Sequence, residues 1–232
     1  MAEEIVEQGY RELADTILEH NPGVDLGRVR AAFELADRAH SGQKRKAGTP
    51  YVTHCVAAAQ ICAEMGLDED SIVAALLHDC IEDTAITHED IARQFGAEVA
   101  DIVEGVTKLT RVQFTSREDE QMENLRKMLM AMAKDIRVIL IKIADRLHNM
   151  RTMEYMVAQK QLEKSLETME IYAPIAHRLG LQKVKWELED LSLKYLDPDG
   201  YREIITYLDS KADVLNKFMS DVEKKITDRL TE

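Results

Sequence analysis

The segment from residue 69 to residue 83 places the strongest constraint on the fold. Its central stretch, IVAALL at 72–77, is apolar around the whole circumference of a helix. A helix without a polar face lies in the middle of a hydrophobic core rather than at its edge. A second segment, residues 135–153, repeats the pattern with an apolar run at its start. We therefore expect a fold built around buried helices.

The rest of the chain also reads as helical. Apolar residues recur at helical spacing, and no segment alternates in the manner of a strand. Only 10 Gly, 4 Pro and 5% aromatic residues are present, so residues that form turns and strands are scarce. The sequence predicts an all-α bundle of about ten helices. We expect helices over 4–20, 69–83, 135–153 and 201–230, one from a cap at Asp25 to near Gly42, and one through His54 to Gly66. Two further helices are expected to begin at caps at Thr87 and Ser116. A mobile loop is expected at 111–116, a kink or break at Pro174 and a turn at 197–200.

Both buried helices run directly into titratable residues. The first continues into HDCIED at 78–83, and the second into DRLHN at 145–149. Burying such groups is costly unless they coordinate or pair with something. The adjacent side chains of His78 and Asp79 diverge by about 100° on a helix, so both reach one ion only if it lies against the helix end. With His54 and Asp145 from two other helices, these residues form a predicted metal site.

The composition of this ligand set favours a catalytic ion over a structural one. Two imidazoles and two carboxylates, with positions left for water, suit Mn²⁺, Fe²⁺ or Zn²⁺, whereas structural zinc more often uses cysteines. Glu82 and Asp83 share a helix face with the ligands and are candidates to orient or deprotonate a metal-bound water. The alternative is that these acidic residues form solvated helix ends. The three cysteines, Cys55, Cys62 and Cys80, are expected to be reduced core thiols.

Charge and hydropathy exclude several classes of protein. A formal net charge of -13 argues against a general nucleic-acid binder, which needs a broad cationic surface. The N-terminal sequence MAEEIVEQ is acidic and has no apolar run, and nothing approaches the ~18 consecutive apolar residues of a membrane span. We expect a cytoplasmic protein that binds neither membranes nor nucleic acid directly.

Long stretches of the sequence resemble one known family. The spacing of His54, His78-Asp79 and Asp145 is the signature of the HD superfamily. The surrounding text is similar to the hydrolase domain of long RelA/SpoT-type alarmone proteins. The matching stretches are GQKRKAGTPYVTH at 42–54, AALLHDCIEDT at 74–84, FGAEVADIVEGVTKLT at 95–110, ENLRKMLMAMAKDIRVILIKIADRLHNMRTM at 123–153 and ETMEIYAPIAHRLG at 167–180.

The resemblance implies an activity and a role for each matched residue. It implies removal of the 3′-pyrophosphate from ppGpp and pppGpp, giving GDP or GTP plus pyrophosphate, with Mn²⁺ as the metal. The implied metal ligands are His54, His78, Asp79 and Asp145, the catalytic pair is Glu82 and Asp83, and the guanosine is held by Arg45, Lys46, Asn149 and Thr152. The residue types agree, since a guanidinium can stack on a purine and an ammonium can meet a phosphate.

The sequence departs from the family pattern at two positions and in its extent. Relatives often carry Ser at Ala47 and Pro at Cys55, whose side chain is expected to point away from the metal along its helix. We expect residues 1–196 to form the hydrolase domain and residues 197–232 a helical extension leading to a synthetase domain. Two other functions remain open: a regulatory HD module that binds the alarmone without turnover, and an HD phosphohydrolase acting on another nucleotide.

Overall fold

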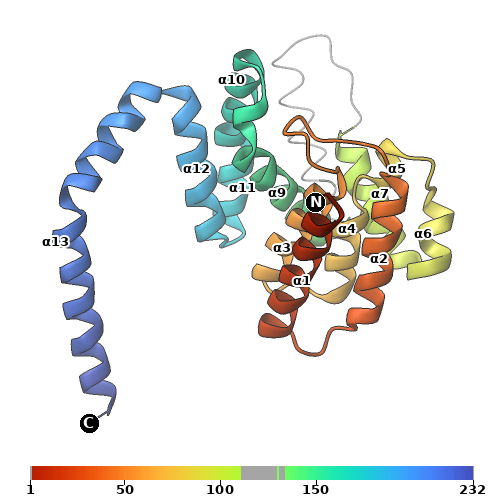
Figure 1. Cartoon of the computed structure of the whole chain (residues 1–232), viewed down its shortest axis with the longest axis horizontal. Helices are drawn as coiled ribbons and strands as arrows, with labels where there is room; N and C mark the ends of the chain where they lie inside the picture. Colours follow the sequence, from red (N-terminus) through yellow and green to blue (C-terminus); the bar gives the residue numbers. More distant parts are fainter. Residues whose placement is uncertain (1, 111–129, 131–133, 232) are drawn as a thin grey trace.

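The computed structural model describes residues 2–110, 130 and 134–231, and this part of the chain is helical (Figure 1). Across those residues the only β-type pairing is an isolated bridge between Lys44 and Pro50. The predicted all-α class is therefore confirmed. No helix in the described ranges is long and apolar enough to cross a membrane.

The helices begin and end close to the predicted positions. The elements are α1 (Ala2–His20), α2 (Leu26–Ala39), α3 (Val52–Glu64), α4 (Glu69–Leu77), α5 (Cys80–Asp83), α6 (His88–Phe95), α7 (Ala97–Thr110), α9 (Ile136–Arg151), a 3₁₀ turn η1 (Met153–Tyr155), α10 (Ala158–Glu167), a π-helical turn η2 (Thr168–Tyr172), α11 (Ala173–Arg178), α12 (Gln182–Leu196) and α13 (Pro198–Thr231). The predicted caps at Asp25 and Thr87 accept backbone hydrogen bonds, and so does Asp135, which stands at the predicted start of its helix. The predicted cap at Ser116 and loop at 111–116 lie outside the described residues.

Helix α4 occupies the centre of the core, as its apolar circumference predicts. Its residues from Ile72 to Leu77 are no more than 1% exposed. It packs against α2, α3, α7 and α9, which surround it. Helix α9 packs in turn on α3 and α7, so the two apolar segments of the sequence lie at neighbouring positions in one core.

The helix predicted over 69–83 is interrupted, which corrects the expectation of a continuous helix. Helix α4 ends at Leu77, and the short helix α5 begins at Cys80. Between them, Asp79 has φ −96° and ψ −6°. A turn at this point removes the divergence that a regular helix imposes on adjacent side chains. The side chains of His78 and Asp79 consequently meet, with Nε2 of the histidine 3.1 Å from Oδ2 of the aspartate.

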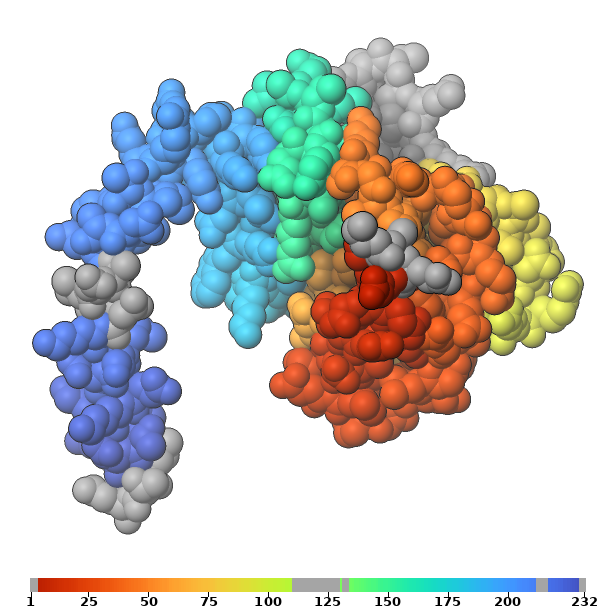
Figure 2. Space-filling view, viewed as in Figure 1, coloured from red at the N-terminus to blue at the C-terminus, as the bar shows by residue number. Residues whose placement is uncertain are grey.

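The C-terminal helix differs from the rest of the molecule in its surroundings. The predicted turn at 197–200 is wrong in extent, because only Asp197 separates α12 from α13. Oδ1 of Asp197 accepts a hydrogen bond of 3.0 Å from the backbone N–H of Gly200, which caps α13, and Pro198 occupies the first helical position, where its missing N–H costs nothing. Helix α13 then extends away from the helical body (Figures 1 and 2).

Pro174 does not break the chain of helical turns that contains it. The stretch from Ala158 to Arg178 runs through α10, η2 and α11 without interruption. The wide π-helical turn η2 ends at Tyr172, two residues before the proline. A π-turn relaxes the backbone pairing with which a proline ring conflicts. Of the predicted kink or break, the break is therefore absent, and a local widening of the helix precedes the proline.

Candidate metal centre

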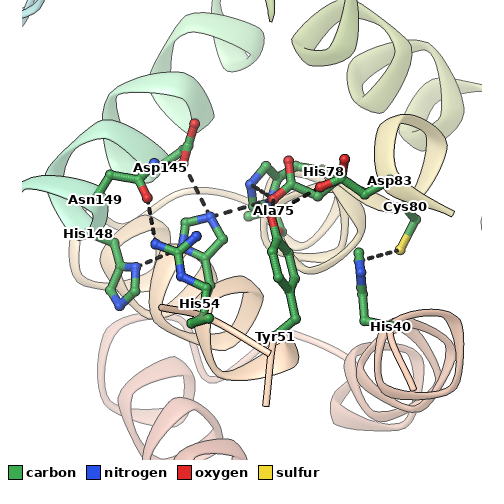
Figure 3. Close-up of polar contacts among 12 residues, drawn as sticks. His40, Tyr51, His54, Ala75, His78, Cys80, Asp83, Asp145, His148 and Asn149 are labelled. Atoms are coloured by element: carbon green, nitrogen blue, oxygen red, sulfur yellow. Dashed lines mark hydrogen bonds and ion pairs between the residues drawn. The ribbon is translucent and has the colours of Figure 1, made fainter. Parts of the chain in front are cut away.

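Three helical elements bring the predicted metal ligands together. His54 comes from the first turn of α3, Asp145 from α9, and His78 and Asp79 from the turn between α4 and α5 (Figure 3). Nε2 of His54 lies 3.2 Å from Oδ1 of Asp145 and 3.6 Å from Oδ2 of Asp79. One ligand atom each from His54, His78 and Asp145 lies within 4.8 Å of the other two.

The hydrogen bonding of His78 is that of a metal ligand. Its Nδ1 lies 2.8 Å from the carbonyl oxygen of Ala75 and donates to it. Its Nε2 is buried and makes no hydrogen bond, although Oδ2 of Asp79 lies 3.1 Å away as an ion-pair partner. Metal-binding histidines commonly donate their other ring N–H to a backbone carbonyl, which fixes the tautomer and leaves a lone pair for the ion. The orphaned nitrogen therefore fits a cation at this position.

The charge of the centre also fits a cation. Burial lowers the pKa of His78, but the carboxylates of Asp79 and Asp145 outweigh burial and raise that pKa to about 9. Burial raises the pKa of Asp79, and the neighbouring His78 outweighs it and holds the pKa below its ordinary value. The buried carboxylates thus retain their negative charge and attract a positive partner, which a divalent ion supplies.

Asp145 is held by two further side chains of its own helix. Oδ2 accepts a hydrogen bond of 2.6 Å from Nζ of Lys142, and Oδ1 accepts one of 2.5 Å from Nδ2 of Asn149. Burial raises the pKa of this carboxyl, yet Lys142 and His54 hold it well below its ordinary value. Asp145 is therefore a fixed carboxylate rather than a mobile one.

His54 is oriented by a histidine that the sequence analysis did not place in the site. Nδ1 of His54 lies 2.7 Å from Nδ1 of His148 (Figure 3). One of the two nitrogens must donate and the other accept. Burial and the nearby His54 lower the pKa of His148 to about 3, so this imidazole is neutral near pH 7. A neutral His148 that accepts from Nδ1–H of His54 leaves Nε2 of His54 free as a ligand.

One member of the predicted acidic pair, Asp83, contacts Tyr51. The single hydroxyl proton of Tyr51 is shared between Oδ2 of Asp79, at 2.8 Å, and Oδ2 of Asp83, at 3.1 Å. Asp83 is exposed and Glu82 half-buried. Tyr51 thereby connects one predicted metal ligand to one member of the pair, a role that the sequence analysis missed.

The four predicted guanosine-binding residues line one cavity of about 740 Å³. Arg45, Lys46, Asn149 and Thr152 contribute to its wall, together with Tyr51 and Asp145. Nη2 of Arg45 donates a hydrogen bond of 2.7 Å to Oδ1 of Asn149, so the loop before α3 is connected to α9. Glu82 and Asp83 are not part of this wall among the described residues.

The cysteines confirm one expectation and correct another. Cys55, Cys62 and Cys80 are all buried and unpaired, as predicted. Cys55, however, does not point away from the centre. Its sulfur lies within 4.8 Å of ligand atoms of His78 and Asp79. A helix that delivers His54 was expected to turn the next side chain aside, but the interruption after α4 brings His78 and Asp79 within its reach.

The sequence contained a signal for two of the residues that it missed. Lys142 and His148 lie three residues before and three residues after Asp145. Side chains at that spacing share a helix face, so both were available to the centre once Asp145 was assigned to it. No comparable signal existed for the contacts of Tyr51 with Asp79 and Asp83, which join residues 28 and 32 positions apart.

The fold and this constellation define the class of the protein. Residues 32–182 match the HD domain family, and the chain belongs to that family. Membership of the family implies a divalent metal ion, and the described residues include a set that can hold one.

Within that family, the chain is similar to proteins that are named for the synthesis or hydrolysis of guanosine polyphosphates. The chain is 48% identical over 212 residues to "Probable GTP pyrophosphokinase" of Mycobacterium leprae, covering 91% of this chain and 27% of the relative. It is 45% identical over 221 residues to "Bifunctional (p)ppGpp synthase/hydrolase SpoT" of Escherichia coli K12, covering 94% of this chain and 32% of the relative. The chain thus spans about a quarter to a third of the length of these curated relatives. The resemblance to RelA/SpoT-type proteins is confirmed.

One solved structure shares the fold over most of the chain. It is described as "A metazoan ortholog of SpoT hydrolyzes ppGpp and plays a role in starvation responses". The superposition has a TM-score of 0.51 and 28% sequence identity, and it covers 74% of this chain and 92% of the other.

Proposed function

We propose that this chain is a cytoplasmic, metal-dependent hydrolase that removes the 3′-pyrophosphate of ppGpp and pppGpp, giving GDP or GTP plus pyrophosphate. The observation that carries the proposal is the convergence of three buried ligands, His54, His78 and Asp145, beside a cavity with a cationic wall. Relatives named as 3′-pyrophosphohydrolases of this nucleotide support the choice of substrate.

We propose Mn²⁺ as the resident ion, held by His54, His78, Asp79 and Asp145. Mixed imidazole and carboxylate ligands suit an ion of this borderline-to-hard kind. When bound, such an ion polarises a phosphoryl oxygen and lowers the pKa of a coordinated water. Lys142 and His148 hold two of the ligands in position through the contacts to Asp145 and His54.

The acidic pair is proposed to move the protons of the reaction. Water attacks the phosphorus that is joined to the ribose 3′ oxygen, and the bond between that phosphorus and the 3′ oxygen breaks. Glu82 and Asp83 take the proton from the water and return one to the 3′ oxygen as pyrophosphate leaves. The hydroxyl of Tyr51, which lies within hydrogen-bond distance of both Asp79 and Asp83, orients Asp83 beside the ligand Asp79.

The cavity wall is proposed to bind the nucleotide. Arg45 offers a planar guanidinium to the purine, and Lys46 is exposed and offers a point charge to phosphate. Asn149 and Thr152 lie on the last turns of α9 and its cap, where they can meet the base beside Asp145. Because Asn149 bonds both Arg45 and Asp145, nucleotide binding and ligand geometry are coupled through one amide.

The division of the chain is also proposed. We assign residues 1–196 to the hydrolase unit and residues 197–232 to a helical extension that leads toward a synthetase domain. The support is that α12 ends at Leu196, that the described side chains of α13 are largely exposed, and that one relative is named as bifunctional.

The test is an assay of the purified chain with Mn²⁺ and pppGpp beside a panel of ordinary nucleotides. We expect pyrophosphate release from the alarmone alone, and its loss in Asp79→Asn. Asp101→Asn is the matched control, because Asp101 is an exposed aspartate that pairs with His88 and belongs to neither ligand set. Alarmone binding without turnover would instead identify a regulatory module, and turnover of other nucleotides only would refute the proposed substrate.

A further inference from the structure

Cys55 belongs to a second set of potential ligands that overlaps the first. One ligand atom each from Cys55, His78 and Asp79 lies within 4.8 Å of the other two. Cys55 itself has no exposed surface. The same cluster contains Nε2 of His78, which is buried and makes no hydrogen bond. The set therefore combines a thiol, a carboxylate and an imidazole nitrogen around one point.

The chemistry of this set differs from that of the first. A sulfur, a nitrogen and an oxygen form a donor group typical of Zn²⁺ and similar thiophilic ions, whereas Mn²⁺ prefers oxygen and nitrogen. Bonds of about 2.0 to 2.3 Å place the ligands of a tetrahedral ion about 3.5 Å apart. Asp79, with 16% of its side chain exposed, is the one member of the set that is not fully enclosed.

The two sets cannot be filled at the same time. Nδ1 of His78 is occupied by the carbonyl of Ala75, so Nε2 is the one nitrogen that this residue can offer to an ion. A cation drawn toward the sulfur takes that nitrogen away from the set that contains His54 and Asp145. Occupancy of one position thus excludes the other.

We propose that Cys55, His78 and Asp79 form an alternative site for a thiophilic divalent cation, Zn²⁺ being the natural candidate, which competes with the ion held by His54 and Asp145. On binding, the S–H bond of Cys55 breaks, its proton leaves to solvent, and the sulfur forms a bond to the cation without change of oxidation state. The partly exposed carboxylate of Asp79 provides the point of access. If the proposed hydrolase function holds, the same event withdraws the productive ion and inhibits the enzyme.

Cadmium provides a direct probe, because a thiolate bound to Cd²⁺ produces an ultraviolet charge-transfer band that nitrogen and oxygen ligands do not. We expect the band on titration of the ion-free chain with Cd²⁺, its saturation at one ion per chain, and its removal by an excess of Zn²⁺. Cys55→Ala should lose the band and bind Cd²⁺ at least about tenfold more weakly. Cys62→Ala is the matched control, since Cys62 lies on the same helix, is equally buried and belongs to neither ligand set.

A second substitution at Cys55 distinguishes the loss of a cation ligand from a disturbance of the fold. Cys55→Ser retains the size of the side chain, so loss of the band with an unchanged circular dichroism spectrum supports the proposal. A wild-type chain without the band, a band that persists in Cys55→Ala, or equal losses in Cys55→Ala and Cys62→Ala would overturn it. Pyrophosphate release with Mn²⁺ is measured separately: a chain that binds Cd²⁺ through sulfur without hydrolysing pppGpp refutes the proposed function alone.

Discussion

Replacing His148 by leucine removes the imidazole that meets His54 at 2.7 Å between the two Nδ1 atoms. His54 then loses the acceptor that selects its tautomer and fixes its ring plane, while all four proposed metal ligands remain in the chain. The expected consequence is weaker Mn²⁺ binding with little change in fold, because His148 is half-buried and its neighbours in α9 are unaltered.

The magnitude follows from the single hydrogen bond that is lost. A hydrogen bond of this kind contributes about 1 kcal/mol, and each 1.4 kcal/mol is tenfold in affinity. Substitution of a residue that orients a metal ligand costs about 10- to 100-fold in metal affinity. We therefore expect the Kd for Mn²⁺ to rise about tenfold or more, with a loss of only about 1 kcal/mol in the unfolding free energy of the ion-free chain.

Calorimetric titration with Mn²⁺ in the absence of nucleotide measures the effect without involving the cavity wall. His148→Asn is the rescue variant, because its amide oxygen can accept the hydrogen bond from Nδ1–H of His54. It should bind Mn²⁺ more tightly than His148→Leu. His177→Leu is the control, since His177 is exposed on α11 and its ring meets Gln182 rather than a metal ligand.

Two results would refute the reasoning. Wild-type affinity in His148→Leu would mean that His54 needs no acceptor. An affinity in His148→Asn no better than that of the leucine variant would mean that ring packing, rather than hydrogen bonding, is what His148 contributes.

Four further outcomes are expected. Tyr51→Phe keeps the ring but removes the hydroxyl shared by Asp79 and Asp83. We expect kcat for pppGpp to fall about tenfold, and an unchanged kcat in steady-state assays would contradict that role. Lys142→Met leaves the buried carboxylate of Asp145 without its cation and should lower the unfolding free energy of the ion-free chain, measured in urea, by about 3 to 5 kcal/mol. The pKa of Asp145 in the folded chain lies below its value in the unfolded chain. Its carboxylate therefore stabilises the fold at any pH above the unfolded pKa, and this stabilisation is lost as the pH falls toward the folded pKa. Melting temperatures of the ion-free wild type should decline on acidification below about pH 4, and the decline should be shallower in Lys142→Met. Removal of residues 197–232 should leave both the melting temperature and Mn²⁺-dependent pyrophosphate release in place, because the described side chains of α13 are largely exposed; loss of either would contradict the proposed domain division.

Local chemistry explains why most helix boundaries were predictable. Asp25, Thr87 and Asp135 stand where a short polar side chain can accept from the first backbone N–H groups of a helix. Capping depends on neighbours within three or four residues, so the sequence carries the whole signal. The same holds for the burial of α4, which follows from an apolar circumference that no surface position accepts.

The predictions of a continuous helix over 69–83 and of a Cys55 side chain that points away from the metal were wrong, because contacts between distant parts of the chain override local preference at these positions. His78 and Asp79 directly follow an apolar helical segment, yet the chain turns at these two residues. The turn directs both side chains to one point between α3 and α9. The orientation of Cys55 was misjudged for the same reason, since it depends on where that turn lies.

The sequence by itself determined that this chain is helical, which two segments are buried, and that titratable residues at 54, 78, 79 and 145 must find partners in the core. Those conclusions rest on the periodicity of apolar residues and on the cost of burying charge, and both can be judged from the amino-acid sequence without a structure. Only the tertiary structure decided the tautomer of His78, the contact of His148 with His54, and the approach of Cys55. Each depends on distances between helices that are far apart in the chain, and no local rule specifies such distances.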